Sequence, residues 1–197
     1  MAWLKRPTWR LALCYTGILI LIYCSAPTPV SVALGLIPIA LGQSLRVWAA
    51  GHLVKNKRLT TTGPYAYAKN PLYLGAITIV MGFCIVGMPP WNLQLTWRDP
   101  RLILYLVFLA AFFLYYMPRK MKIEGDRLRA IYGEAYTRYE KSVPDMIPRL
   151  TPYRSGDDWR WSWAQTVDNS EHGTVMSLGV GLGLMLLRTW LRVNEVL

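Results

Sequence analysis

The strongest constraint on this chain is that its apolar residues arrive in long blocks separated by polar connections. Four blocks stand out, at positions 11–26, 30–50, 72–88 and 102–117, and a weaker one covers 174–187. The chain has 197 residues, of which 53% are hydrophobic and 17% are charged. Blocks of this length suit a lipid bilayer, which a helix of about 20 residues can span. We therefore expect an all-α fold, a polytopic membrane bundle of about five transmembrane helices.

A polar, amphipathic segment follows the fourth block. Apolar residues recur at helical spacing between positions 119 and 141, and the stripe consists of Leu128, Ile131, Ala135 and Tyr139. Extending it backwards places Glu124 and then Lys120 on the same face. Gly133 indicates a break between two helices, and Val143-Pro144 ends the helical part. We expect this segment to be a cytoplasmic helical appendage.

The chain divides at Pro148. Residues 1–148 form the predicted membrane core, and residues 149–197 form a C-terminal extension. Charged residues and tryptophans alternate from 157 to 163, which suits an interfacial position. The small-residue-rich block at 174–187 predicts a last membrane helix, with an interfacial or re-entrant segment as the alternative.

The positive charge follows the positive-inside pattern. The net charge is +11, and Lys and Arg gather at the N-terminus, between 55 and 69, and between 119 and 141. The alternate connections, near 27–29 and 91–101, carry few. This alternation predicts a multi-pass protein of a bacterial inner membrane, with its N-terminus in the cytoplasm and membrane lipids as partners. It does not favour nucleic acid. A cleaved signal peptide is the alternative for the first block, but no typical cleavage site follows it.

Metal and thiol chemistry have few candidate residues. Cys14, Cys24 and Cys84 all lie in apolar blocks, and the chain has two histidines, His52 and His172. Buried small hydrophobic side chains are the simpler interpretation of the cysteines, and no metal site is expected.

The connection between the second and third blocks carries the chemistry. Asn70-Pro71 predicts a helix start, because Asn is a good N-cap and Pro fits the first helical position. A helix N-terminus beside Lys69 is a suitable site for an anionic ligand group.

The chain carries an ordered set of motifs: Leu45-Arg46-Val47-Trp48-Ala49, Gly63-Pro64-Tyr65, Lys69-Asn70-Pro71-Leu72-Tyr73-Leu74-Gly75, Glu124 with Leu128, Tyr132-Gly133, Tyr136, Tyr139 and Val143-Pro144 with Pro148. This set resembles the isoprenylcysteine carboxyl methyltransferase family, and the related phospholipid methyltransferases share much of it. It covers roughly residues 41 to 148.

The resemblance implies an integral membrane methyltransferase that uses S-adenosyl-L-methionine. The cofactor contacts that it implies are Leu59, Thr60, Tyr65, Lys69, Asn70, Pro71, Leu72, Tyr73 and Glu124. It implies a substrate-contacting cation at Lys120, and the intramembrane Arg46 is a second catalytic candidate. The chemistry is compatible, since a cation suits the cofactor's carboxylate, a glutamate its ammonium group, and tyrosines its sulfonium.

The chain departs from the family pattern at two places. Lys69-Asn70 stands where the family has Arg-His, and Glu124-Gly125 stands where it has paired glutamates. The substrate is expected to be lipophilic or lipid-linked. A carboxylate acceptor is favoured, since no histidine in the candidate core is available to deprotonate an amine. The alternatives are a phospholipid N-methyltransferase, an NADPH-dependent membrane reductase, and a non-catalytic membrane protein with a decayed site.

Overall fold

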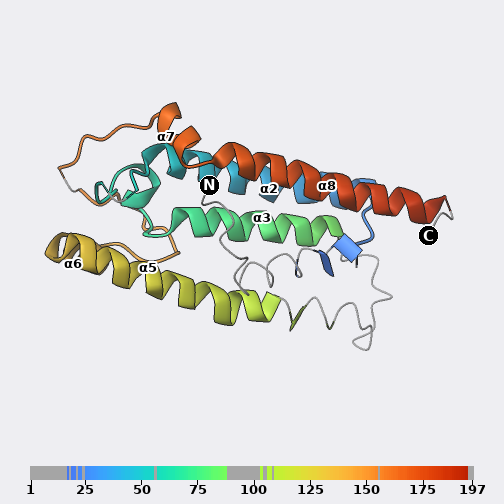
Figure 1. The fold of residues 1–197 in the computed structure, drawn as a ribbon, viewed down its shortest axis with the longest axis horizontal. Helices are drawn as coiled ribbons and strands as arrows, with labels where there is room; N and C mark the ends of the chain where they lie inside the picture. Colours follow the sequence, from blue (N-terminus) through green and yellow to red (C-terminus); the bar gives the residue numbers. More distant parts are fainter. Residues whose placement is uncertain are drawn as a thin grey trace, which may run out of the picture.

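The computed structural model describes residues 25–55, 57–87, 109–154 and 156–194, together with positions 17, 19, 20, 22, 23, 103, 106 and 107. Every regular element in this part of the chain is a helix (Figure 1). The all-α prediction is therefore confirmed for the described residues. Most of the first apolar block, part of the fourth and the connection at 91–101 lie outside them.

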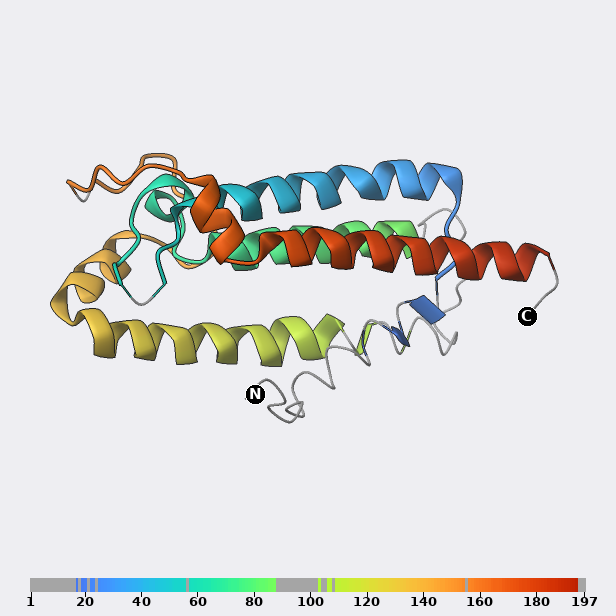
Figure 2. The same cartoon turned by 45° about the horizontal axis from the view of Figure 1, so that its top comes forward.

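Three long helices pack together: α2 (Pro29–His52), α3 (Pro71–Gly87) and α8 (Glu171–Val193). Both α3 and α8 run antiparallel to α2 (Figure 2). The helix α5 (Met117–Tyr132) continues from a π-helical turn, η2 (Ala111–Tyr116). In both views α3 lies between α2 and α5. Three shorter elements gather at one end of the long helices: η1 (Gly63–Ala66), α6 (Glu134–Ser142) and α7 (Trp163–Asp168).

Several predicted element boundaries are confirmed. The helix α3 begins at Pro71, and the carbonyl of Asn70 accepts hydrogen bonds from the N–H groups of Tyr73 and Leu74. Gly133 separates α5 from α6 with a φ of 53°, a value that glycine adopts at little cost. The helix α6 ends at Ser142, directly before Val143-Pro144.

Four glycines bring α2 and α3 into close contact. Gly35 on α2 faces Gly82 on α3, and Gly42 on α2 faces Gly75 on α3. On each helix the two glycines are two turns apart. A Cβ atom at Gly35 would lie 2.6 Å from the carbonyl oxygen of Gly82, and one at Gly75 would lie 2.7 Å from that of Gly42. Such contacts, in which a small residue lets two backbones approach, are typical of helix packing in membranes.

The end of the bundle away from α6 is closed by hydrogen bonds. The Ser31 hydroxyl donates to the Val86 carbonyl at 3.0 Å, and the Ala26 N–H donates to the Gly87 carbonyl at 2.9 Å. A buried cluster of Ile39, Val86 and Met185 joins α2, α3 and α8 at this end. The connection 25–28 therefore fixes how α2 and α3 are paired.

Among the described residues, two helices are long and apolar enough to cross a membrane. They are α2 and the Glu171–Leu191 part of α8, and α3 is a shorter apolar helix of 17 residues. These lengths and compositions are consistent with a membrane protein. The last block, 174–187, thus lies within a helix of sufficient length, as the sequence predicts.

A matched pair of glycine substitutions tests the packing of α2 on α3. In Gly82→Ala the new Cβ would meet the Gly35 carbonyl oxygen at 2.7 Å, so we expect a loss of stability of about 1–3 kcal/mol. Gly183 on α8 has nothing within 4 Å among the described residues, so Gly183→Ala should leave stability unchanged or raise it. Thermal unfolding of the purified protein in detergent compares the two, and equal melting temperatures would contradict the proposed contact.

Candidate functional site

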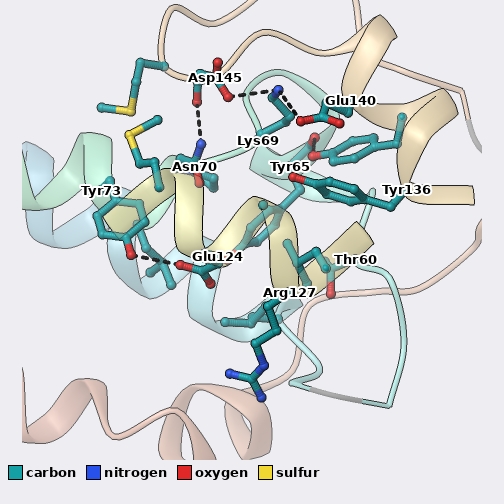
Figure 3. Close-up of a pocket in the computed structure, with 18 of the residues that line it drawn as sticks. Thr60, Tyr65, Lys69, Asn70, Tyr73, Glu124, Arg127, Tyr136, Glu140 and Asp145 are labelled. Atoms are coloured by element: carbon teal, nitrogen blue, oxygen red, sulfur yellow. Dashed lines mark hydrogen bonds and ion pairs between the residues drawn. The ribbon is translucent and has the colours of Figure 1, made fainter. Parts of the chain in front are cut away.

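A cavity of about 1080 Å³ lies between the α2–α3 connection, the first turns of α3 and one face of α5 and α6. Figure 3 shows side chains from these elements pointing toward one another across it. The nine residues that the family resemblance assigns to the cofactor all line this cavity: Leu59, Thr60, Tyr65, Lys69, Asn70, Pro71, Leu72, Tyr73 and Glu124. Of the two catalytic candidates, Arg46 lines the cavity and Lys120 does not.

The wall that carries Tyr65 and Lys69 is held by the segment after α6. Four backbone hydrogen bonds of 2.9–3.1 Å join the two stretches, from the N–H groups of Lys69, Asn70, Arg149 and Tyr153 to the carbonyls of Pro144, Asp145, Tyr67 and Ala66. The Asn70 side-chain amide also donates to the Asp145 carbonyl, at 3.3 Å. Asn70 therefore uses its side chain to tie the two segments together.

A cluster of tyrosines packs behind this wall, on the side of α6. Tyr136 and Tyr139 are buried, and the Tyr139 hydroxyl donates to the Tyr65 carbonyl at 2.7 Å. Burial raises the pKa of Tyr65, with smaller contributions from the Tyr139 phenol and the Glu124 carboxylate. Burial also raises the pKa of Tyr139, and it raises that of Tyr136, together with Glu140, to about 12. These phenols therefore remain neutral at physiological pH.

A hydrogen bond crosses the cavity between α3 and α5. The Tyr73 hydroxyl donates to the Glu124 carboxylate at 2.8 Å (Figure 3). It joins two positions 51 residues apart that the sequence had assigned to one site. The contact places a carboxylate and a phenol side by side at the edge of the cavity.

The amino group of Lys69 is enclosed by acidic side chains. Its side chain is 9% exposed, and Nζ lies 2.9 Å from the Asp145 carboxylate and 4.0 Å from that of Glu140. Arg129 pairs with Glu140 at 2.8 Å and with Asp126 at 2.9 Å. Sequence reasoning passed over Asp145 and Glu140, and the signal available for them was that a cation beside a helix start needs counter-ions once it is buried.

Lys120 and half of the predicted apolar stripe, Ile131 and Ala135, fall outside the packed face, whereas Leu128 and the buried Tyr139 lie on it. Lys120 is exposed, and Ile131 is 46% exposed. The face toward the cavity instead carries Met117, Met121, Glu124, Leu128 and Tyr132 at spacings of three and four. Its centre is therefore rotated from the predicted stripe. Glu124 lies toward one edge of this face, which leaves Lys120 beyond the edge.

Arg46 is bound to a residue of the C-terminal extension. Its Nη2 lies 2.6 Å from Glu171 Oε1, and its Nε donates to Glu171 Oε2 at 3.1 Å. The Glu171 side chain, on the first residue of α8, is 4% exposed. An intramembrane arginine calls for a partner of this kind, but the sequence alone does not show which acid it is.

The tryptophan-rich segment covers the end of α2. The Trp161 indole N–H donates to the Val47 carbonyl at 3.2 Å, and the Arg58 guanidinium lies 5.3 Å above the Trp159 ring. Arg58 also pairs with Asp157. Trp163 is 66% exposed. The segment therefore packs against the α2–α3 connection. The exposed Trp163 can still lie at the membrane–water interface that the sequence predicts.

Comparison with known proteins gives one relative. The chain is 29% identical over 134 residues to the cobalt-zinc-cadmium resistance protein CzcN of Cupriavidus metallidurans, a match that covers 67% of this chain and 56% of that protein. The chain thus spans little more than half the length of this relative. No family model matches the sequence. No solved structure matches it.

The tyrosine cluster predicts how stability depends on alkaline pH. The pKa of Tyr136 is raised from 10.0 to about 12, so the folded state favours the neutral phenol. Its contribution to stability is present below pH 10 and is lost as the pH rises toward 12. We expect the unfolding free energy of Tyr136→Phe to fall less steeply across this range than that of the parent. The prediction is contradicted if the pKa of Tyr136 in the folded parent protein, followed by tyrosinate absorbance, equals the ordinary value of 10.0.

Proposed function

We propose that this chain is an integral membrane methyltransferase that uses S-adenosyl-L-methionine and acts on a lipophilic or lipid-linked acceptor. The observation that carries the proposal is the lining of the cavity. Nine residues, named from a sequence resemblance and separated by up to 65 positions, converge on one cavity of about 1080 Å³. Eight of them lie within positions 59–73, and the ninth, Glu124, joins them from α5 through its hydrogen bond with Tyr73.

The cavity offers groups that match the chemistry of the cofactor. Glu124 supplies a carboxylate for an ammonium group, and the first turn of α3 supplies a positive end for a carboxylate. The neutral phenol of Tyr65 and the ring of Tyr73 provide aromatic faces for a sulfonium. The volume exceeds the range of about 300–1,000 Å³ typical of a single small-molecule site, so an acceptor group can share it.

The chain's own contribution to methyl transfer would be positioning. When bound, the cofactor supplies an electrophilic methyl group whose bond to sulfur breaks as the acceptor atom bonds to it. The tyrosine cluster and the segment 143–153 after α6 hold one wall of the cavity in place. Tyr73 and Glu124 hold the opposite side. Fixing two reactants in this way can contribute several kcal/mol, about 7–11 in the best cases. An acceptor that carries a proton can lose it to Glu124 or to water.

Charged contacts at both ends of α8 support a membrane-spanning arrangement. Glu171 meets Arg46 at one end, and Arg188 donates to the Ser25 carbonyl at 2.7 Å at the other. The intervening stretch is about 25 Å long at 1.5 Å per residue, close to the ~30 Å of a hydrocarbon core. We propose that the cavity end is cytoplasmic in a multi-pass protein, because the α2–α3 connection, with Lys55 and Lys57, and α6, with Arg138 and Lys141, lie at that end (Figure 1).

Cysteine labelling tests this orientation. In a background in which Cys14, Cys24 and Cys84 are replaced by serine, we introduce Lys141→Cys on α6 or Asn194→Cys after α8. A membrane-impermeant maleimide added to intact cells should label the second variant and should label the first only after lysis. Labelling of both from outside would contradict the proposed topology.

Cofactor binding tests the enzyme proposal. Glu124→Ala and Tyr73→Phe each remove one partner of the bond across the cavity, so we expect the Kd for S-adenosylhomocysteine to rise roughly tenfold or more. Glu134→Gln changes an exposed acid on α6 and serves as the control. Calorimetric titration gives the Kd of the parent and of the three variants. The proposal fails if the parent binds no better than the Glu124 variant.

The named relative supports a second proposal, that this membrane protein serves resistance to metal ions. The name of that relative refers to resistance to cobalt, zinc and cadmium, and the match covers 67% of this chain. Among the described residues there is no group of three or more His, Cys, Asp or Glu that could hold a metal ion. Growth of a deletion strain in the three metals, complemented by the parent or by Glu124→Ala, tests whether resistance is linked to the cavity.

A further inference from the structure

A polar cluster inside the apolar helices links the C-terminal extension to the cavity. It contains Gln43 and Arg46 from α2 and Glu171 and Thr174 from α8. Arg46 reaches the cavity wall by passing over Gly75 of α3, where a Cβ atom would lie 2.6 Å from Arg46 Cγ. The position of its guanidinium is therefore set from three helices.

The hydrogen bonds of Arg46 leave little capacity for a ligand. Nε donates to Glu171 Oε2, Nη2 to Glu171 Oε1 and to Thr174 Oγ1 at 3.4 Å, and Nη1 to the Leu72 carbonyl at 3.3 Å. A guanidinium has five N–H donors, so these contacts engage four and leave one on Nη1. The pair of parallel donors that binds a carboxylate is already taken by Glu171.

Glu171 also neutralises this part of the cavity wall. Its side chain is 4% exposed, and it offsets the charge of Arg46 at a distance of 2.6 Å. Arg46 and the buried Tyr65 line the same cavity, so the ion pair borders the space of the proposed cofactor contacts. An anionic ligand group brought here would meet a buried carboxylate of the same sign.

We propose that Glu171 determines the acceptor class. By occupying the fork of Arg46, it makes the cavity select an acceptor with a single uncharged oxygen, such as a hydroxyl group, over a carboxylate. Arg46 then positions that oxygen through its remaining N–H. This reverses the preference for a carboxylate that the sequence favours, and it rests on the proposed function only in treating the bound molecule as the methyl acceptor.

Two probes with the same alkyl chain test the proposal. We measure equilibrium binding of radiolabelled 1-dodecanol and dodecanoate to the purified full-length protein, in one detergent at a pH where dodecanoate is ionised. The parent should bind the alcohol more tightly than the acid. In Glu171→Gln the ratio of the two Kd values should shift toward dodecanoate by roughly tenfold or more, because the fork of Arg46 is released.

Control variants separate this effect from general damage. Glu134→Gln makes the same chemical change on an exposed helix and should leave the ratio unchanged. The double variant Arg46→Gln/Glu171→Gln should lose the gain for dodecanoate, since no guanidinium remains. If Glu171→Gln does not fold, Glu171→Asp draws the carboxylate back by one methylene and should give a smaller shift in the same direction.

The outcomes are distinct from those of the proposed function. A parent that binds dodecanoate more tightly than dodecanol, or a Glu171→Gln ratio equal to that of Glu134→Gln, overturns the specificity proposal. Binding of S-adenosylhomocysteine is measured on the same samples. If the parent shows the predicted head-group preference but binds no S-adenosylhomocysteine, the methyltransferase proposal fails and the assignment of Glu171 stands.

Discussion

The close packing of α2 against α3 is the contact on which the other features depend. The glycine pairs 35/82 and 42/75 fix the two helices in register. That register brings Gly75 beneath the stem of Arg46 and sets where α3 begins. Because hydrophobic burial does not drive helices together inside a bilayer, close backbone contact and buried polar pairs have to provide the stability. The cavity is built outward from this pair.

The cavity itself exists because α5 does not pack closely on α3. The end of α5 near Gly133 is held by the tyrosine cluster and by the Arg129–Glu140 pair, and Glu124 reaches α3 through Tyr73. Between these points the side chains of Ile77, Phe113, Met117 and Met121 line an apolar part of the same cavity. A polar compartment thus continues into an apolar one. This arrangement suits a reaction between a charged cofactor and a lipophilic partner.

Local signals in the sequence predicted the elements well. Asn70-Pro71, Gly133 and Val143-Pro144 mark real boundaries, because capping and backbone restrictions act over a few residues. The nine positions that the family resemblance assigns to a cofactor share one cavity. Lys120 was predicted to face the cavity, but a small rotation of the inward face of α5 is enough to exclude it. On α6 the inward face is formed by tyrosines and not by aliphatic residues. The number of membrane crossings stays a prediction beyond the two long apolar helices.

Long-range charge pairing is what the sequence could not supply. Lys69 with Asp145, and Arg46 with Glu171, are separated by 76 and 125 positions, and nothing in the local pattern of either acid marks it as a partner. Both pairs change the chemistry expected of the cation. A lysine or arginine read alone suggests a site for an anion, whereas the same side chain paired with a carboxylate is an oriented donor whose charge is offset, by the buried Glu171 for Arg46 and by the exposed Asp145 for Lys69. The two residues that looked most like anion receptors in the sequence are therefore better described as fixed parts of the cavity wall. Under the proposal for Glu171, they would favour an uncharged acceptor that is held by orientation.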